Sequence, residues 1–312
     1  MIPYLIPFFF LSTLAVKENE KPLKSFINNK YFYYLIVLFF IIFIGLRYEV
    51  GCDWHQYKLM FDKYSIGFLE MIKLNFNSTH ALHEIGHIFI STISRRNIYV
   101  VNLIYATLFA LPFFYFCFTL ERKYLSLVIS YPYYIIVIGM GPIRQAACIS
   151  ILMLSILLVS QKKYYSHLFL SIISLIIHQF SLIFNGLLLA CYFPKFLNKN
   201  LSKRIIFLIP LVLFVLIFQS PAIIRKIIFY FTLVGTVIPP AKSAIFIWLI
   251  NFIPALIFIK NIDKFNINKD LKKIFLFFSL TEFFLLPIVF LNSVIAYRLL
   301  LNIFPTSIYI TS

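Results

Sequence analysis

Arginines beside apolar stretches are the residues in this sequence whose type and placement best suit chemistry. Arg47 directly follows an apolar run, Arg144 lies at the start of another, and Arg298 lies near the start of the last one. A guanidinium is a planar fork of N–H donors that matches the oxygens of a phosphate or pyrophosphate. At one level of a membrane, the three arginines would form a site for such an anion. The alternative is that each arginine only reaches towards lipid headgroups.

Titratable side chains near these arginines could supply acid–base chemistry. Asp53 lies in the polar segment 47–57, close to Arg47, where a carboxylate partly removed from water can act as a general base or stabilise a cation. The alternative is that Asp53 holds Arg47 in place. His178 interrupts a long apolar stretch, so we expect it in a water-lined cavity or as a neutral core histidine. Glu282, inside another apolar run, is expected to pair with a polar side chain within the protein.

The segment His83-Glu84-Ile85-Gly86-His87 is a literal HExxH motif. On a helix the two histidines share a face, so they could hold zinc while the glutamate activates water. A third ligand is not evident, because about 10 Å of helix would separate His80 from His87, and no Asp-Gly pair occurs in a later apolar run. A zinc membrane protease is therefore the weaker hypothesis. We expect these histidines to be polar residues of an interfacial helix.

The composition identifies the class of protein that must position these residues. Of the 312 residues 62% are hydrophobic and 12% are charged, and the mean hydropathy of +0.92 is far above that of soluble domains. The 28 Lys and Arg exceed the 11 Asp and Glu, but they gather in short loops between apolar runs, which indicates membrane topology rather than nucleic-acid binding. The 4 cysteines lack CxxC spacing and indicate no zinc site or disulfide framework. The sequence predicts an all-α, polytopic integral membrane protein.

The apolar runs predict the elements of this protein. A spanning helix needs about 20 mostly apolar residues, and the sequence predicts about 10 transmembrane segments, at 2–16, 31–46, 97–120, 124–140, 143–160, 166–192, 204–219, 243–260, 273–291 and 294–312. Between the second and third lies the segment 47–96, in which residues 66–74 and 81–93 keep the apolar spacing of short interfacial helices. No soluble domain interrupts the chain, so residues 1–312 are expected to form a single transmembrane domain.

Lysine and arginine also predict the orientation, because basic loops favour the cytoplasmic side. The basic loops are residues 17–30, 121–123, 162–163, 195–204 and 260–273. A single span over residues 166–192 would put the loop 195–204 on the opposite side. We therefore expect this stretch to be two half-length helices that enter and return, broken near His178-Gln179. The outer face then carries the segment 47–96, the turn before Arg144 and the region of Arg298.

Short motifs in a fixed order resemble those of a known family. Leu46-Arg47, followed by Val50-Gly51-Cys52-Asp53-Trp54 and Tyr57, resembles the opening motif of the EpsG family of bacterial membrane proteins, although Cys52 and Trp54 replace the usual Thr and Tyr. Glu84-Ile85-Gly86 is similar to the family's Glu-x-Gly, and Arg144-Gln145-Ala146-Ala147 to its Arg-Gln-x-Ala. His178-Gln179-Phe180-Ser181 resembles its His-x-x-Ser element, and Arg298 fits a late arginine.

The resemblance implies a Wzy-like polysaccharide polymerase, which joins repeat units carried on undecaprenyl pyrophosphate at the outer face of the bacterial cytoplasmic membrane. The leaving pyrophosphate gains charge and needs donors, for which we expect Arg47, Arg144 and Arg298. The acceptor hydroxyl needs a base, which we expect to be Asp53 or, second, His178. The remaining residues expected to bind substrate are Trp54 and Tyr57, by stacking on sugar rings, with Gln145 and Glu84.

The same resemblance implies the partners. They are the undecaprenyl-pyrophosphate-linked glycan, the lipid bilayer, a flippase and a chain-length regulator, and the product would be an O-antigen, a capsule or an exopolysaccharide. We expect no cofactor or metal, because the arginines would take the place of a metal. A flippase or other transporter of lipid-linked oligosaccharides would also gather arginines in a membrane cavity. The ionisable residues lean to the outer side, which favours the polymerase over the transporter.

Overall fold

The structure is a computed structural model, and it describes residues 2–18, 20, 29–51, 53–63, 69–70, 85–178, 181, 184–188, 242–265 and 267–312. Within these ranges every regular element is a helix, so the predicted all-α class is confirmed there. By length and composition, 3 of the helices could cross a membrane: α7 (Ile98–Phe118), α9 (Ile143–Ser160) and α16 (Lys269–Leu291). Five other predicted spans, those at 2–16, 31–46, 124–140, 166–192 and 243–260, correspond in the described residues to shorter apolar helices, and the total of about 10 segments stays a prediction.

The helix bounds follow the apolar runs of the sequence. The remaining helices are α1 (Ile2–Lys17), α3 (Lys30–Gly45), α4 (Trp54–Lys63), α6 (Ile85–Ile93), α8 (Lys123–Ser130), the π-helix η1 (Tyr131–Ile138), α10 (Tyr164–Ile177), α15 (Lys242–Lys260) and α17 (Ser293–Thr311). Helix α6 matches the second half of the helix predicted at 81–93. Helix α4 begins in a segment predicted to be a polar loop. The predicted span 204–219 and most of residues 66–74 lie outside the described residues.

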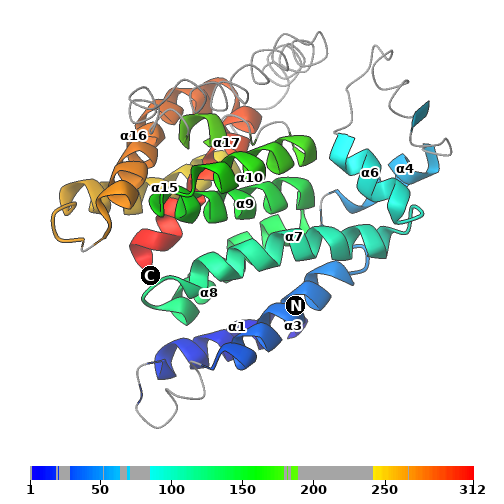
Figure 1. Cartoon of the computed structure of the whole chain (residues 1–312), viewed down its shortest axis with the longest axis horizontal. Helices are drawn as coiled ribbons and strands as arrows, with labels where there is room; N and C mark the ends of the chain where they lie inside the picture. The colour runs from blue at the N-terminus through cyan, green and yellow to red at the C-terminus, as the bar shows by residue number, and fades with distance from the viewer. Residues whose placement is uncertain are drawn as a thin grey trace. The chain divides into compact units, whose positions relative to one another are not determined.

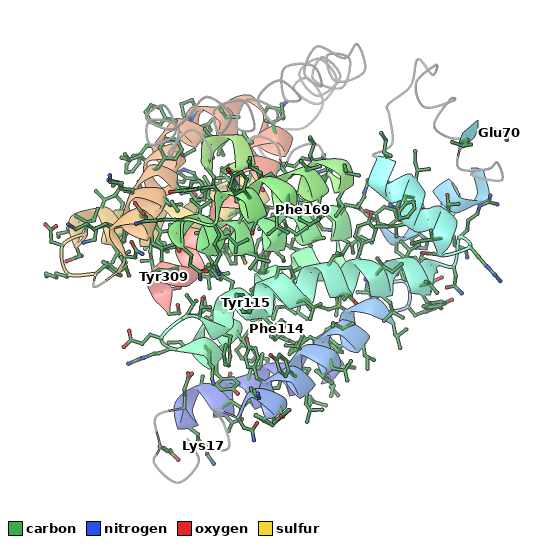
Figure 2. The ribbon with its side chains drawn as sticks, in the orientation of Figure 1. Lys17, Glu70, Phe114, Tyr115, Phe169 and Tyr309 are labelled. Carbon is green, nitrogen blue, oxygen red and sulfur yellow. The ribbon has the colours of Figure 1, made fainter. Side chains whose placement is uncertain are left out.

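Apolar residues cover the outer face of α3 as well as its inner face. Tyr33, Ile36 and Phe40 are buried, while Leu35 and Leu38 on the other side are 63% and 51% exposed. The next long helix repeats this pattern, because Phe114 of α7 is fully buried and the neighbouring Tyr115 is half exposed (Figure 2). A surface helix of a soluble protein carries polar residues on its exposed face. These helices therefore belong to a membrane protein.

The contacts divide the chain into two compact units, and the boundary falls inside α9. The first unit contains Met1–Ile72, Ile85–Leu154 and Thr311–Ser312, and the second contains Lys73–Glu84 and Ser155–Ile310. The expectation of a single transmembrane domain over residues 1–312 stays a prediction.

In the first unit, α3 and α7 run side by side in opposite directions (Figure 1). At one end the Tyr33 hydroxyl of α3 donates to the carbonyl oxygen of Phe114 on α7. At the other end, Gly45 lies so close to α7 that a Cβ there would come within 2.9 Å of the Leu103 Cα. Glycine is required at such a close approach of two backbones. The two helices are thus tightly packed where α3 leads into the polar segment.

In the second unit, side chains of α15 connect it to two neighbouring helices. Trp248 Nε1 donates to the carbonyl oxygen of Glu282 on α16 (3.1 Å), and Asn251 Nδ2 donates to that of Leu300 on α17 (3.0 Å). Inter-helix hydrogen bonds of this kind hold apolar helices together in lipid, where hydrophobic burial contributes little. The Glu282 carboxyl group is fully buried and has no hydrogen-bond partner among the described residues, so its predicted polar partner is not found there.

Candidate functional site

The polar segment after α3 is fixed against the turn that precedes α9. Gly51 has a φ of +104°, which L side chains rarely adopt, and a Cβ at this position would collide with the carbonyl oxygen of Met140. The two backbones are therefore in direct contact. This contact brings the residues that follow Gly51 to the start of α9, where Arg144 lies.

Arg47 is held by acceptors from three parts of the first unit. Its Nη1 donates to the carbonyl oxygen of Ile44 at the end of α3 (2.8 Å), and its Nε to that of Val50 (3.0 Å). Its Nη2 donates to Asn102 Oδ1 on α7 (3.3 Å), and the side chain is only 6% exposed. The guanidinium thus satisfies a carbonyl of the last turn of α3 and ties the loop to α7. A contact of Arg47 with a diphosphate stays a prediction.

Asp53 and Tyr57 are joined by the start of α4. The Asp53 carbonyl oxygen accepts from Tyr57 N (2.9 Å), so the helical hydrogen bonding begins at this residue. One turn later the Tyr57 hydroxyl donates back to Asp53 Oδ2 (3.2 Å). These two residues of the polar segment 47–57 are therefore positioned by a helix, which sets the carboxylate and the tyrosine hydroxyl at a defined separation.

Arg144 completes a hydrogen-bond chain with these two residues. It lies in the first turn of α9, half-buried, and its Nε donates to the Tyr57 hydroxyl oxygen (3.2 Å). Its guanidinium carbon lies 5.4 Å from the centre of the Tyr57 ring, which is within cation–π range. The Tyr57 hydroxyl thus donates to Asp53 and accepts from Arg144. We refer to Asp53, Tyr57 and Arg144 as the acid–arginine chain.

The aromatic side chains expected to stack on sugar rings are buried in the first unit. Trp54 is 3% exposed and Tyr57 is 2% exposed. The Trp54 ring instead packs against the Arg47 guanidinium at 5.9 Å and against Tyr99 at 5.9 Å. Gln145, also expected to bind substrate, is 5% exposed. Sugar stacking by Trp54 or Tyr57 stays a prediction, and it would require these rings to become accessible.

Two further residues lie at this site: Tyr105, which the sequence analysis did not single out, and His87, which it named only as part of the HExxH motif. His87 of α6 is fully buried, and its Nδ1 shares a hydrogen bond of 3.1 Å with the Tyr105 hydroxyl on α7. Its ring lies 5.3 Å from the ring of Tyr57. A signal did exist in the apolar run of α7, where Asn102 and Tyr105 are three residues apart and so share a helix face. One contacts Arg47 and the other contacts His87.

No metal centre is found in the part of the chain that the structure describes. There, no three His, Cys, Asp or Glu side chains lie close enough together to hold a metal ion. His83 and Glu84 of the HExxH motif lie outside that part, as does Cys52. The expected contribution of Glu84 to substrate binding therefore stays a prediction.

His178 of the second unit lies where the chain reverses. Helix α10 ends at Ile177, and His178 is extended. Asn185 Oδ1 then accepts from Ser171 Oγ (3.2 Å), although in one continuous helix these residues would be about 21 Å apart. The predicted interruption near His178 is thus present, and the residues after it return alongside α10. Whether this reversal lies within a membrane stays a prediction.

Arg298 lies in the second unit, in α17 and half-buried. Arg47, Asp53, Tyr57 and Arg144 lie together in the first unit. With Trp54 and Gln145, the first unit therefore contains six of the predicted site residues. The approach of Arg298 and His178 to them stays a prediction.

Comparison with known proteins assigns the chain to a family. The sequence model of the EpsG family matches residues 30–312, which include every residue of the acid–arginine chain. No curated protein and no solved structure matches the chain. The EpsG family is a Wzy-like polymerase family, so membership indicates a polysaccharide polymerase and a membrane protein. With nearly its whole length matched, and with Asp53 and Arg144 both hydrogen-bonded to one buried tyrosine, the chain belongs to the EpsG family.

Proposed function

We propose that this protein is a glycosyltransferase that polymerises repeat units carried on undecaprenyl pyrophosphate, at the outer face of the bacterial cytoplasmic membrane. Family membership supports polymerase chemistry. The observation that carries the proposal is the acid–arginine chain, because one tyrosine hydroxyl connects a carboxylate to a guanidinium. A base and an anion-binding group held beside each other are what transfer from a pyrophosphate to a hydroxyl requires.

The proposed step exchanges one carbon–oxygen bond for another. The bond between the anomeric carbon of the growing chain and the pyrophosphate oxygen breaks, and the pyrophosphate leaves with the electron pair. The hydroxyl oxygen of the incoming unit bonds to that carbon, and its proton passes to the Asp53 carboxylate. Arg144 stabilises the charge that develops on the leaving group. The sum is a longer glycan on one lipid and a free undecaprenyl pyrophosphate.

The other predicted residues are assigned secondary parts in this proposal. Arg298 is a second donor to the diphosphate, and His178 is the alternative base. Arg47, whose donors are directed at Ile44, Val50 and Asn102, supports the loop that carries Asp53. A lipid-linked glycan supplied by a flippase is the substrate, and an O-antigen, a capsule or an exopolysaccharide is the product class.

Replacement of Arg144 tests this function. In cells whose only copy of the gene carries Arg144→Ala, we expect the protein to remain in the membrane while the glycan stops at one repeat unit, as measured by gel electrophoresis of the extracted polysaccharide. The matched control is Arg122→Ala, because Arg122 is an exposed arginine at the N-cap of α8 and makes no capping hydrogen bond there. This control should give full-length product. Long-chain glycan from the Arg144→Ala cells would overturn the proposal.

A further inference from the structure

We infer that His87 and Tyr105 are positioning residues that hold Tyr57 in the acid–arginine chain. The inference rests on the proposed function, because it assigns a task to residues that touch neither the glycan nor the pyrophosphate in that proposal. Both side chains are fully buried, and they come from α6 and α7, which contribute no reacting group. Their task is to fix the geometry between the proposed base and the proposed anion-binding arginine.

The position of the Tyr57 hydroxyl depends on how its ring is held. A tyrosine hydroxyl lies on the axis of a rigid ring, so the two side-chain torsions that place the ring also place the oxygen. The hydroxyl must meet Asp53 Oδ2 and Arg144 Nε at the same time, each at 3.2 Å. A tilt of the ring would lengthen one of these hydrogen bonds or both. The packing around the ring therefore controls the whole acid–arginine chain.

His87 is the group that packs against this ring from α6. The two ring centres are 5.3 Å apart, with an angle of 50° between the planes. The imidazole is itself fixed by its 3.1 Å hydrogen bond to Tyr105, and the Tyr105 ring lies 5.9 Å away. The order of dependence thus runs from Tyr105 to His87, then to Tyr57, and finally to Asp53 and Arg144. Tyr105, His87, Tyr57 and Arg144 come from four different helices, α7, α6, α4 and α9.

The alternative is that His87 and Tyr105 only fill the core between α6 and α7. A purely structural pair would lower the stability of the protein and the amount recovered, but not the rate of each folded molecule. A positioning pair would lower kcat, because a displacement of about 1 Å at a reacting group costs about 100-fold in rate. The KM for the lipid-linked glycan should change little, because neither residue contacts it. The two readings are therefore separable by kinetics.

The experiment compares variants of the full-length protein in lipid nanodiscs, using as substrate the single-repeat lipid-linked glycan extracted from Arg144→Ala cells. His87→Asn keeps a polar atom near the position of Nδ1 but removes the ring contact with Tyr57. His87→Phe keeps a ring but removes the hydrogen bond, as does Tyr105→Phe. We expect kcat per folded molecule to fall about tenfold to 100-fold in all three, with KM within about twofold of the original.

A double-mutant cycle tests whether the two residues act as one unit. Because His87→Phe and Tyr105→Phe remove the same hydrogen bond, the double variant should be no slower than the worse single variant. The control is Tyr134→Phe, since Tyr134 is also fully buried in the first unit and its hydroxyl is 3.1 Å from Ser150 Oγ. Its kcat should be unchanged.

The outcomes separate the two hypotheses. If Arg144→Ala blocks polymerisation while His87→Asn and Tyr105→Phe keep the original kcat, the positioning inference is wrong and the proposed function stands. If Arg144→Ala cells still make long chains, the proposed function itself fails.

Discussion

At the scale of single residues, Arg47 and Arg144 occupy similar places in the sequence but different environments in the structure. Arg47 is 6% exposed and directs its donors at Ile44, Val50 and Asn102. Arg144 is half-buried, and its Nε meets the Tyr57 hydroxyl. Both stand at the ends of apolar runs, so the sequence alone assigns them the same task. The difference arises from the acceptors that the fold brings to each guanidinium. Some of these acceptors are distant in the sequence, so the residues next to each arginine do not predict them.

Substitution by lysine should distinguish the two arginines. A lysine ammonium has all its donors on one nitrogen, so it cannot replace the three separate nitrogens with which Arg47 meets its acceptors. Arg47→Lys should therefore lower the free energy of unfolding by about 3 kcal/mol. Arg144→Lys should lower it by less than about 1 kcal/mol while reducing polymer length. Denaturant unfolding in detergent and glycan electrophoresis give the two readouts. If Arg47→Lys keeps its stability but loses affinity for the lipid-linked glycan, Arg47 is a diphosphate ligand instead.

The sequence predicted some site residues and missed others for physical reasons. Asp53, Tyr57 and Arg144 were identified because charged and aromatic residues stand out where an apolar run ends. His87 was named only as part of the HExxH motif, in a helix expected to be interfacial, and its complete burial was not predicted. Burial of a single histidine depends on whether its helix packs on another, here α6 on α7. Local spacing does not carry that information.

At the scale of elements, the long apolar runs predicted the positions of most helices correctly. The helix in the polar segment was not predicted. Helices α3, α7, α9 and α16 begin and end within a few residues of the predicted runs. Helix α4 was missed because it is only 10 residues long and half of these residues are polar, so its apolar pattern is too short to stand out. Its first turn, which begins directly after Asp53, nevertheless decides the geometry of the site.

The contact of Gly51 with Met140 should be essential to the site. Gly51→Ala adds a Cβ that collides with the Met140 carbonyl oxygen at a φ that alanine rarely adopts, so the loop must move away from α9. We expect a loss of about 1–3 kcal/mol in unfolding free energy, and single-repeat glycan. Gly186→Ala is the matched control, because its Cβ would meet nothing within 4 Å. Full-length glycan from Gly51→Ala would show that the loop does not need this contact.

At the scale of the whole molecule, hydropathy gave the class of protein but not the relation between its two units. The composition sufficed for an all-helical membrane protein, because only helices and barrels satisfy the backbone in lipid. The positions of His178 and Arg298 relative to Arg144 depend on how helices that are distant in the sequence pack together. The apolar faces of these helices are similar in composition, so the sequence does not specify which faces meet. The orientation of the chain is likewise a prediction from the basic loops.

Cysteine labelling in intact cells should establish that orientation. In a background lacking Cys52 and Cys191, with Cys117 and Cys148 buried, cysteine is introduced at exposed His55 of α4 or at exposed Gln161 after α9. A membrane-impermeant maleimide should label His55→Cys in intact cells and Gln161→Cys only after permeabilisation. The opposite pattern would place the acid–arginine chain on the cytoplasmic side and rule out polymerisation at the outer face.

The short length of α3 has a consequence for the surrounding lipid. Its 16 residues extend about 24 Å, against about 30 Å of bilayer hydrocarbon. At one end Lys30 is exposed and can stretch to the headgroups, but at the other end Arg47 is bound inside the protein. The difference between the length of α3 and the hydrocarbon thickness must therefore be accommodated at the Arg47 end of the helix. There we expect the leaflet to thin, so that phosphate groups sink towards the depth of Arg144.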